Sequence, residues 1–314
     1  MDAIKQLLKH ETAGDPVKGL KWTRKTTQKV ADELRSLGID VGRTTVGRLL
    51  KAMKYSLKVN QKSIGAGKNP ERNAQFEYIT RQRKQAAAVG IAVISVDSKK
   101  KETVGPFKNP GATWRQQAHQ VNDHDFRSLA EGTAVPYGIY DVEANRGFVC
   151  VGASCDTPEF AVECIVKWWC AEGRERYAGA NELVILADGG GSNGSHCRLW
   201  KSALQEKLCD RHGVSVTVAH YPPGASKWNP IEHRLFSEIS KNWAGEPLDS
   251  YETILNFIRT TKTRTGLKVR SQLVTKQYER KIRVSDERMK QLNITPHETL
   301  PKWNYTLSPI VERC

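Results

Sequence analysis

The stretch VGIAVISVD, residues 89–97, is an apolar run rich in β-branched residues that ends in an acid, Asp97. A run of this kind predicts a buried β-strand. The run ELVILAD, residues 182–188, has the same character and also ends in an acid, Asp188. A buried carboxylate is costly, so the two acids favour a functional site. Either acid alone is also typical of a turn or a helix cap.

The elements around these two runs predict the fold class. A hairpin is expected over 134–154, a strand over 214–220, and helices over 71–88, 157–177, 195–212 and 229–243. Polar residues with scattered glycines, 98–133, predict a long loop. Strands that alternate with helices in this order predict an α/β fold in which helices cover a mixed sheet.

A third acid stands in the stretch YPPGASKWNPIEHRLFSEI, residues 221–239. Its first half has the Pro, Gly, Ser and Asn of a turn, and its second half has the pattern of an amphipathic helix. Glu232 lies where the two halves meet. Sites in α/β sheets form beyond the carboxyl ends of strands, so we expect the loop to bring Glu232 to Asp97 and Asp188. Glu232 alone is also typical of a favourable helix N-terminus.

The three carboxylates predict a divalent-metal site. They are hard oxygen ligands with no ligand-spaced His or Cys near them, a set that suits Mg²⁺ or Mn²⁺. Two such ions about 4 Å apart activate a water or a sugar hydroxyl and stabilise the leaving oxygen of a phosphodiester. The glycine-rich run DGGGSNGS, residues 188–195, lacks the Lys-Ser/Thr of a phosphate-binding Walker loop.

Residues 23–58 predict two short helices around a turn. Val30, Leu34 and Leu37 have helical spacing in the first helix, and Gly38 is expected to end it. Thr44 or Thr45 is expected to cap the second helix, and the spacing is that of a helix-turn-helix. We expect the second helix and a lysine run after Asp97 to contact DNA. These expected contacts are Arg43, Thr44, Thr45, Arg48, Lys51, Lys54, Lys99, Lys100 and Lys101.

The net charge of +15 is concentrated at the N-terminal end. Residues 1–90 hold 19 Lys and Arg against 8 Asp and Glu, whereas residues 91–314 hold 30 against 26. This imbalance favours a module that binds a polyanion over a solubilising charged face. The seven cysteines form no CxxC pair, which argues against a disulfide framework and a zinc site. No apolar run suits a membrane span or a secretion signal, so we expect a cytoplasmic protein without membrane partners.

The chain is expected to have four parts. They are an all-α helix-turn-helix module over 1–60, a linker and connecting helix over 61–90, a catalytic domain over 91–248 and a basic helical extension over 249–314. The extension is strongly basic, since Arg259 to Lys290 contain 11 Lys and Arg against three acids.

The motifs also resemble a known family. WNPIEH, residues 228–233, resembles the segment around the catalytic Glu of mariner-like transposases and their bacterial insertion-sequence relatives. VISVDSKKKETVGPFKNPG (93–111) and LVILADGGGSNGS (183–195) resemble the two other acid blocks of the bacterial ISAzo-thirteen family. The resemblance covers residues 22–300, and it implies an RNase H-like catalytic domain with the triad Asp97, Asp188 and Glu232. It also implies two Mg²⁺ ions, cleavage of transposon ends and transfer of the 3′-OH into target DNA.

The sequence departs from the family pattern in two ways. The second and third acids are 44 residues apart (188 to 232), a longer gap than in mariner relatives. The helix-turn-helix also begins close to residue 1, whereas relatives carry a longer DNA-binding region. A truncated, inactive copy that only binds DNA is therefore one alternative, and an RNase H-like nuclease acting on RNA–DNA hybrids is another.

The intact triad and the basic ends of the chain favour a DNA transposase over both alternatives. The expected partners are double-stranded DNA, as transposon ends and target, and a second copy of the chain in a synaptic homodimer. We expect a bacterial cytoplasmic protein that is associated with the nucleoid when it is bound to DNA.

Overall fold

The computed structural model describes residues 1–310 except residues 12, 16–19, 23–24, 57–70 and 226–227. The chain divides into two compact units, Met1–Gly65 and Ala66–Cys314. The first part of the predicted linker and connecting helix over 61–90, residues 61–70, lies outside the described residues. No helix in the described part of the chain is both long enough and apolar enough to span a membrane.

The first unit contains the expected helix pair. Its elements are α1 (Asp2–Glu11), β1 (Ala13–Asp15), β2 (Leu20–Trp22), α2 (Thr27–Ser36) and α3 (Arg43–Ala52). The buried side chains of Ile4, Val30, Leu34 and Val46 form its core. The strands β1 and β2 form a short antiparallel sheet, so the prediction of an all-α unit was wrong.

The turn between α2 and α3 is set by a glycine, as expected. Gly38 has a φ of +78°, and its N–H donates to the carbonyl of Arg35 while the N–H of Ile39 donates to that of Leu34. These bonds satisfy carbonyls at the helix end. The expected threonine cap of α3 was wrong, because Gly42 precedes the helix and no side chain caps it.

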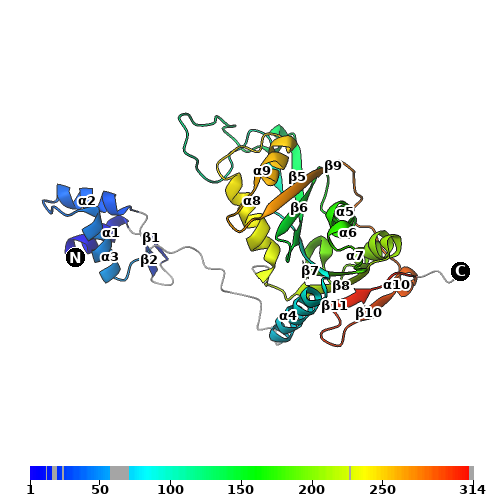
Figure 1. The fold of residues 1–314 in the computed structure, drawn as a ribbon. Coiled ribbons are helices and arrows are strands. Elements are labelled where there is room, and N and C mark those ends of the chain that lie inside the picture. Colours follow the sequence, from blue (N-terminus) through cyan, green and yellow to red (C-terminus); the bar gives the residue numbers. More distant parts are fainter. Residues whose placement is uncertain (12, 16–19, 23–24, 57–70, 226–227, 311–314) are drawn as a thin grey trace. The chain divides into compact units, whose positions relative to one another are not determined.

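The second unit is built on one mixed sheet (Figure 1). The strands, in spatial order, are β10 (Ile294–Pro296), β11 (Asn304–Leu307), β8 (Ser215–Tyr221), β7 (Glu182–Asp188), β3 (Ala92–Ser98), β5 (Gly132–Asp141), β6 (Arg146–Gly152) and β9 (Lys268–Val274). The short strand β4 (Glu102–Val104) pairs with β5. The neighbours β8, β7 and β3 are parallel, and β5 runs antiparallel to β3 and β6. The predicted mixed α/β sheet is confirmed.

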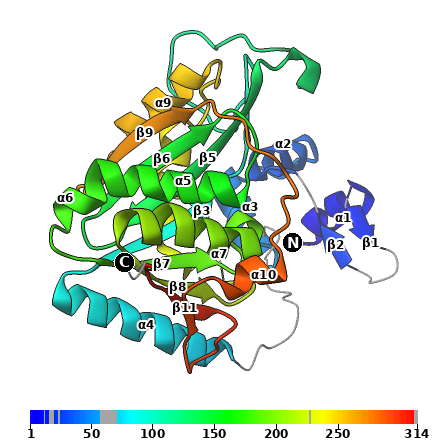
Figure 2. The ribbon, with the colours of Figure 1, turned by 90° about the vertical axis from the view of Figure 1, so that its right-hand side faces the viewer.

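Helices cover both faces of this sheet (Figures 1 and 2). One face carries α5 (Pro158–Trp168) and α7 (Arg198–Leu204), with Phe160, Trp168 and Trp200 buried on it. The short α6 (Arg174–Arg176) follows α5. The opposite face carries α4 (Arg72–Val89), α8 (Ser237–Asn242) and α9 (Tyr251–Thr260). Successive strand residues therefore face different layers: Ile94 lies in the first core and Val93 in the second.

The expected basic helical extension over 249–314 was wrong. Only α9 and α10 (Asp286–Lys290) are helical there, whereas β9 pairs with β6 and β11 pairs with β8. In β9, KVRSQLV, apolar residues alternate with polar ones, so Val269 is buried between exposed basic neighbours. This period of two, hidden in a basic segment, makes the C-terminal region part of the sheet.

We expect the packing of the turn Glu232–Phe236 to contribute strongly to stability. Leu235 is fully buried in this turn, so Leu235→Ala should lower the free energy of unfolding by about 2–5 kcal/mol in denaturant titrations. The adjacent exposed residue provides the control, since Arg234→Ala should change it by less than about 0.5 kcal/mol. Equal effects of the two substitutions would contradict this packing.

Candidate active site

Two of the predicted acids meet at one edge of the sheet. β3 and β7 are parallel neighbours, and Val96 pairs with Ala187 in their register. The next residues, Asp97 and Asp188, therefore stand side by side where both strands end. Asp97 also accepts a hydrogen bond of 2.7 Å from the backbone N–H of Ser98.

A buried asparagine connects the loop after β8 to these acids. The side chain of Asn229 is fully buried, donates to Asp188 at 3.3 Å and accepts a hydrogen bond from the hydroxyl of Ser95. The same hydroxyl accepts from the backbone N–H of Ile231 at 3.1 Å. These bonds fix the start of the turn that carries Glu232 against the centre of β3. Sequence analysis missed Asn229, although it is part of the WNPIEH motif.

A cavity of about 530 Å³ opens at this edge of the sheet. Its lining contains Asp97 and Asp188, the glycine-rich run after β7, and the start of the loop after β8. Glu232 is half-buried and is not part of the lining, but its charge acts on Asp97. The cavity is therefore acidic, and its glycines leave the backbone open to a large ligand.

Asp156 is an acid of this cavity that sequence analysis missed. It lines the cavity, its charge acts on Asp97, and its buried Oδ1 has no hydrogen-bond partner among the residues that the structure describes. β6 is parallel to β3 across β5, so the chain leaves β6 at the same edge of the sheet. The one local signal for Asp156 in the sequence is its position just before Thr157, which caps α5.

The acids at this edge hold their protons more tightly than free carboxyls do. Burial, then the charge of Asp188, raises the pKa of Asp97 to about 8. Burial also raises the pKa of Asp188, against the hydrogen bond from Asn229. Burial and then the charge of Asp188 raise the pKa of Glu232, while His233 and Lys99 act in the opposite direction. The site therefore favours a bound proton or another cation.

The donor chemistry of these residues fits Mg²⁺ or Mn²⁺, although the carboxylates are not gathered as ligands. Within the described residues, no three His, Cys, Asp or Glu side chains are grouped closely enough to hold a metal ion. The unpartnered oxygen of Asp156 and the mutual repulsion of Asp97 and Asp188 nevertheless make carboxylate oxygens available to a hard cation.

The expected DNA contacts differ in exposure. The exposed residues on α3 are Arg43, Thr44, Arg48 and Lys51, whereas Thr45 is half-buried. Lys54, just beyond the helix, is exposed as well. Lys100 and Lys101 are exposed as well. Lys99 differs from these residues, because it pairs with Glu102 at 2.9 Å and lies 4.5 Å from the ring centre of Trp243. Its side chain is only 9% exposed, so it supports the site from within the protein.

The raised pKa of Asp97 predicts a pH-dependent stability in metal-free protein. The pKa of Asp97 is about 8 in the folded protein, whereas the ordinary value for Asp is 3.8. Between these two pH values the folded state therefore binds more protons than the unfolded state. The free energy of unfolding should therefore fall as pH rises from about 4 to about 8. Asp97→Asn should lower this slope and raise the melting temperature at pH 8, measured by thermal unfolding in EDTA. The exposed control Asp249→Asn should keep the wild-type slope, and an unchanged slope in Asp97→Asn would contradict the assignment.

Comparison with known proteins places the chain in a family. A family model described as "Rhodopirellula transposase DDE domain" matches residues 3–309. Among solved structures, the chain is similar to a Mos1 transposase paired-end complex with the left transposon end, at 15% identity and a TM-score of 0.46, covering 82% of this chain and 69% of that one. It is also similar to a pre-cleavage Mos1 transpososome, at 13% identity and a TM-score of 0.46, covering 81% and 68%. No curated protein matches the chain. Because the family model spans nearly the whole sequence, the chain belongs to this family of DDE transposase domains, as its three acid motifs predicted.

Proposed function

We propose that the chain is a transposase that cleaves DNA at transposon ends and joins the 3′-OH to target DNA. The observation that carries the proposal is the meeting of Asp97 and Asp188 at one sheet edge in a chain of the DDE family. The helix-covered mixed sheet supports assigning residues 91–248, together with β9 and β11, to an RNase H-like catalytic domain.

In this proposal Asp97, Asp188 and Glu232 hold the catalytic metal ions. Bound there, Mg²⁺ or Mn²⁺ supplies an activated water or sugar hydroxyl and neutralises charge on the leaving oxygen. Asn229 orients Asp188, and the N–H of Ser98 orients Asp97. Glu232, which is half-buried and follows the segment fixed by Asn229, is the third ligand in this proposal.

The glycine run after β7 supports a DNA substrate. A side chain added at Gly190 or Gly191 would meet no atom within 4 Å, so these glycines are not required by internal packing. Gly191 has a φ of +70°, a conformation that favours glycine. A bare backbone at the wall of an acidic cavity lets a phosphodiester approach the carboxylates closely.

The first prediction of this proposal concerns cleavage. Wild-type protein should nick supercoiled plasmid in Mn²⁺, and Asp188→Asn should lower the rate by at least about a hundredfold while preserving DNA binding, because it removes a metal ligand. Asp249→Asn, an exposed Asp outside the site, is the matched control and should nick as the wild type does. Nicking by Asp188→Asn at the wild-type rate would overturn the triad assignment. Binding without nicking by the wild type would instead favour a DNA-binding protein that lacks catalysis.

We further propose that α2 and α3 form a helix-turn-helix and that α3 enters the major groove of duplex DNA. The exposed side chains of Arg43, Arg48 and Lys51 on α3 support this role. The buried contacts of Val30 and Leu34 in α2 with Val46 in α3 support a fixed angle between the helices.

The second prediction tests α3 as the DNA reader. The triple change Arg43→Ala, Arg48→Ala and Lys51→Ala should weaken binding to a labelled duplex and reduce the slope of log affinity against log salt by about 2 to 3, because each lost phosphate contact removes about 0.9. A second triple, Lys262→Ala, Arg264→Ala and Lys268→Ala, removes the same charge from exposed positions around the start of β9 and should leave the slope unchanged. If the two triples change the slope by the same amount, α3 has no special role in DNA binding.

A further inference from the structure

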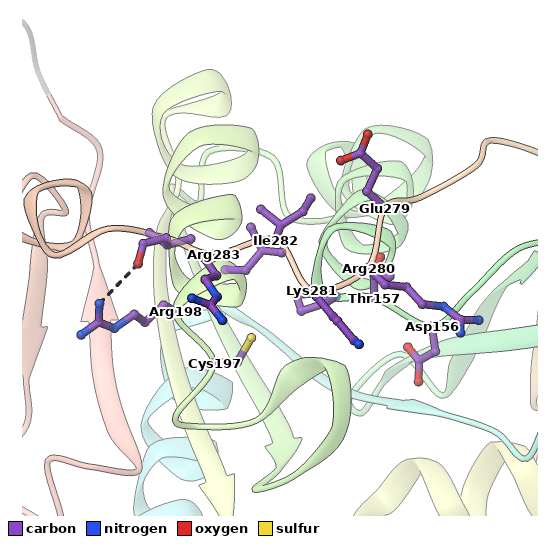
Figure 3. Close-up of a pocket in the computed structure, with 12 residues that line it drawn as sticks. Asp156, Thr157, Cys197, Arg198, Glu279, Arg280, Lys281, Ile282 and Arg283 are labelled. Atoms are coloured by element: carbon purple, nitrogen blue, oxygen red, sulfur yellow. Dashed lines mark hydrogen bonds between the residues drawn. The ribbon is translucent and has the colours of Figure 1, made fainter.

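A second cavity, of about 630 Å³, adjoins the acidic cavity, and Asp156 lines both (Figure 3). Its outer wall is the segment 279–284, ERKIRV, between β9 and α10. We call this cavity the basic pocket, because four cations line it against two acids. The cations are Arg198, Arg280, Lys281 and Arg283, and the acids are Asp156 and Glu279.

The segment 279–284 is anchored at both ends. Before it, the buried Tyr278 donates its hydroxyl to Glu163 at 2.6 Å, and its carbonyl accepts from the thiol of Cys155 at 3.1 Å. At its end, Arg198 donates to the carbonyl of Val284 at 3.3 Å, and Arg198 also pairs with Asp286, just beyond the segment, at 2.6 Å. The residues between these anchors are therefore held over the basic pocket as a fixed arch.

The charged side chains of the arch are directed into the pocket. Figure 3 shows the side chain of Lys281 ending between Cys197 and Asp156, that of Arg283 ending beside Cys197 and that of Arg280 ending beside Asp156, while the carboxylate of Glu279 points away. None of these three cations forms an ion pair with any residue that the structure describes, and all three are exposed. Lys281 has a φ of +63°, and a lysine held in this strained backbone conformation is typical of a functional segment.

The cations of the basic pocket offset the repulsion between the acidic cavity and the phosphates of DNA. Asp97, Asp156 and Asp188 line that cavity, and whichever of them is ionised repels the phosphates of DNA. Cations on an adjoining wall attract a polyanion to the same place and offset the repulsion. Their distribution along an open arch, with Pro158, Leu199 and Ile282 also lining the pocket, fits a chain of phosphates and sugars better than one small anion.

We propose that the basic pocket binds backbone phosphates of the DNA strand whose scissile phosphate lies in the acidic cavity. This proposal rests on the proposed function for the identity of the strand, and it adds the residues that hold that strand. Arg280, Lys281 and Arg283 contact the phosphates, and Arg198 positions the arch through Val284 and Asp286.

The binding test compares two triple variants that lose the same charge. The basic-pocket triple is Arg280→Ala, Lys281→Ala and Arg283→Ala. The control is the triple at Lys262, Arg264 and Lys268. β9 runs from Lys268, opposite Arg146, to Val274, opposite Gly152, so Lys268 lies at the sheet edge remote from Asp156. The probe is a fluorescein-labelled DNA duplex of arbitrary sequence with a single-stranded tail, titrated at several salt concentrations without divalent metal.

The basic-pocket triple should reduce the slope of log affinity against log salt by about 2 to 3, and the control triple should keep the wild-type slope. Equal slopes in the two triples would overturn the proposal. Circular dichroism and thermal unfolding establish that each variant folds. If the triple does not fold, Arg280→Gln with Arg283→Gln takes its place, and the same slope comparison decides.

Plasmid nicking in Mn²⁺ separates this proposal from the proposed function. The basic-pocket triple should raise the DNA concentration for half-maximal nicking about tenfold and keep the rate at saturating DNA, because only binding contacts are lost. A lower saturating rate with an unchanged half-maximal concentration would overturn the binding role. If the wild type does not nick, the proposed function fails, and the salt slopes still decide whether the basic pocket binds DNA.

Discussion

The repulsion between half-buried carboxylates at one sheet edge is the constraint on which the site depends. Asp97 and Asp188 end neighbouring parallel strands, so the register of the sheet forces them together. Burial and mutual charge raise the pKa of Asp97 to about 8. A stable fold accommodates this cost because the sheet below carries a large apolar core, in which Ile94, Ile185 and Val218 are fully buried.

The surroundings of the acids act to hold this arrangement in place. Asn229 binds Asp188 and, through Ser95, fixes the start of the turn that carries Glu232. Lys99 lies against Trp243, and its charge partly opposes the rise in the pKa of Glu232 that burial and Asp188 cause. These contacts keep the carboxylates oriented while leaving their negative charge incompletely neutralised, which is the condition for taking up a cation.

The sequence predicted the strand ends that carry Asp97 and Asp188, because an apolar β-branched run followed by an acid is a local pattern. It also predicted a helix that begins near residue 157 and the glycine that ends α2. It did not predict Asn229 or Asp156 as parts of the site, because their roles arise from residues far away in the sequence. The hydroxyl of Ser95, which connects Asn229 to β3, is 134 positions away.

Charge misled the prediction for the C-terminal region. Basic residues in 259–290 suggested a helical extension, but β9 and β11 belong to the sheet, where they pair with β6 and β8. Such long-range pairing depends on partner strands that a local pattern does not identify. The basic residues of that region are nevertheless divided by the sheet into two groups, with Lys268 at one end of β9 and Arg280 beyond the other.

Binding of Mn²⁺, measured by isothermal titration calorimetry in wild type and in Asp97→Asn, tests the central claim most directly. If the carboxylates at the sheet edge form one metal site, the wild type binds Mn²⁺ and releases protons at pH 7, and this release fades as pH rises past about 8, since the metal ion replaces the proton that Asp97 holds with a pKa of about 8. Asp97→Asn then binds Mn²⁺ at least about tenfold more weakly and without this proton release. Equal affinity and equal proton release in the two proteins would contradict the account.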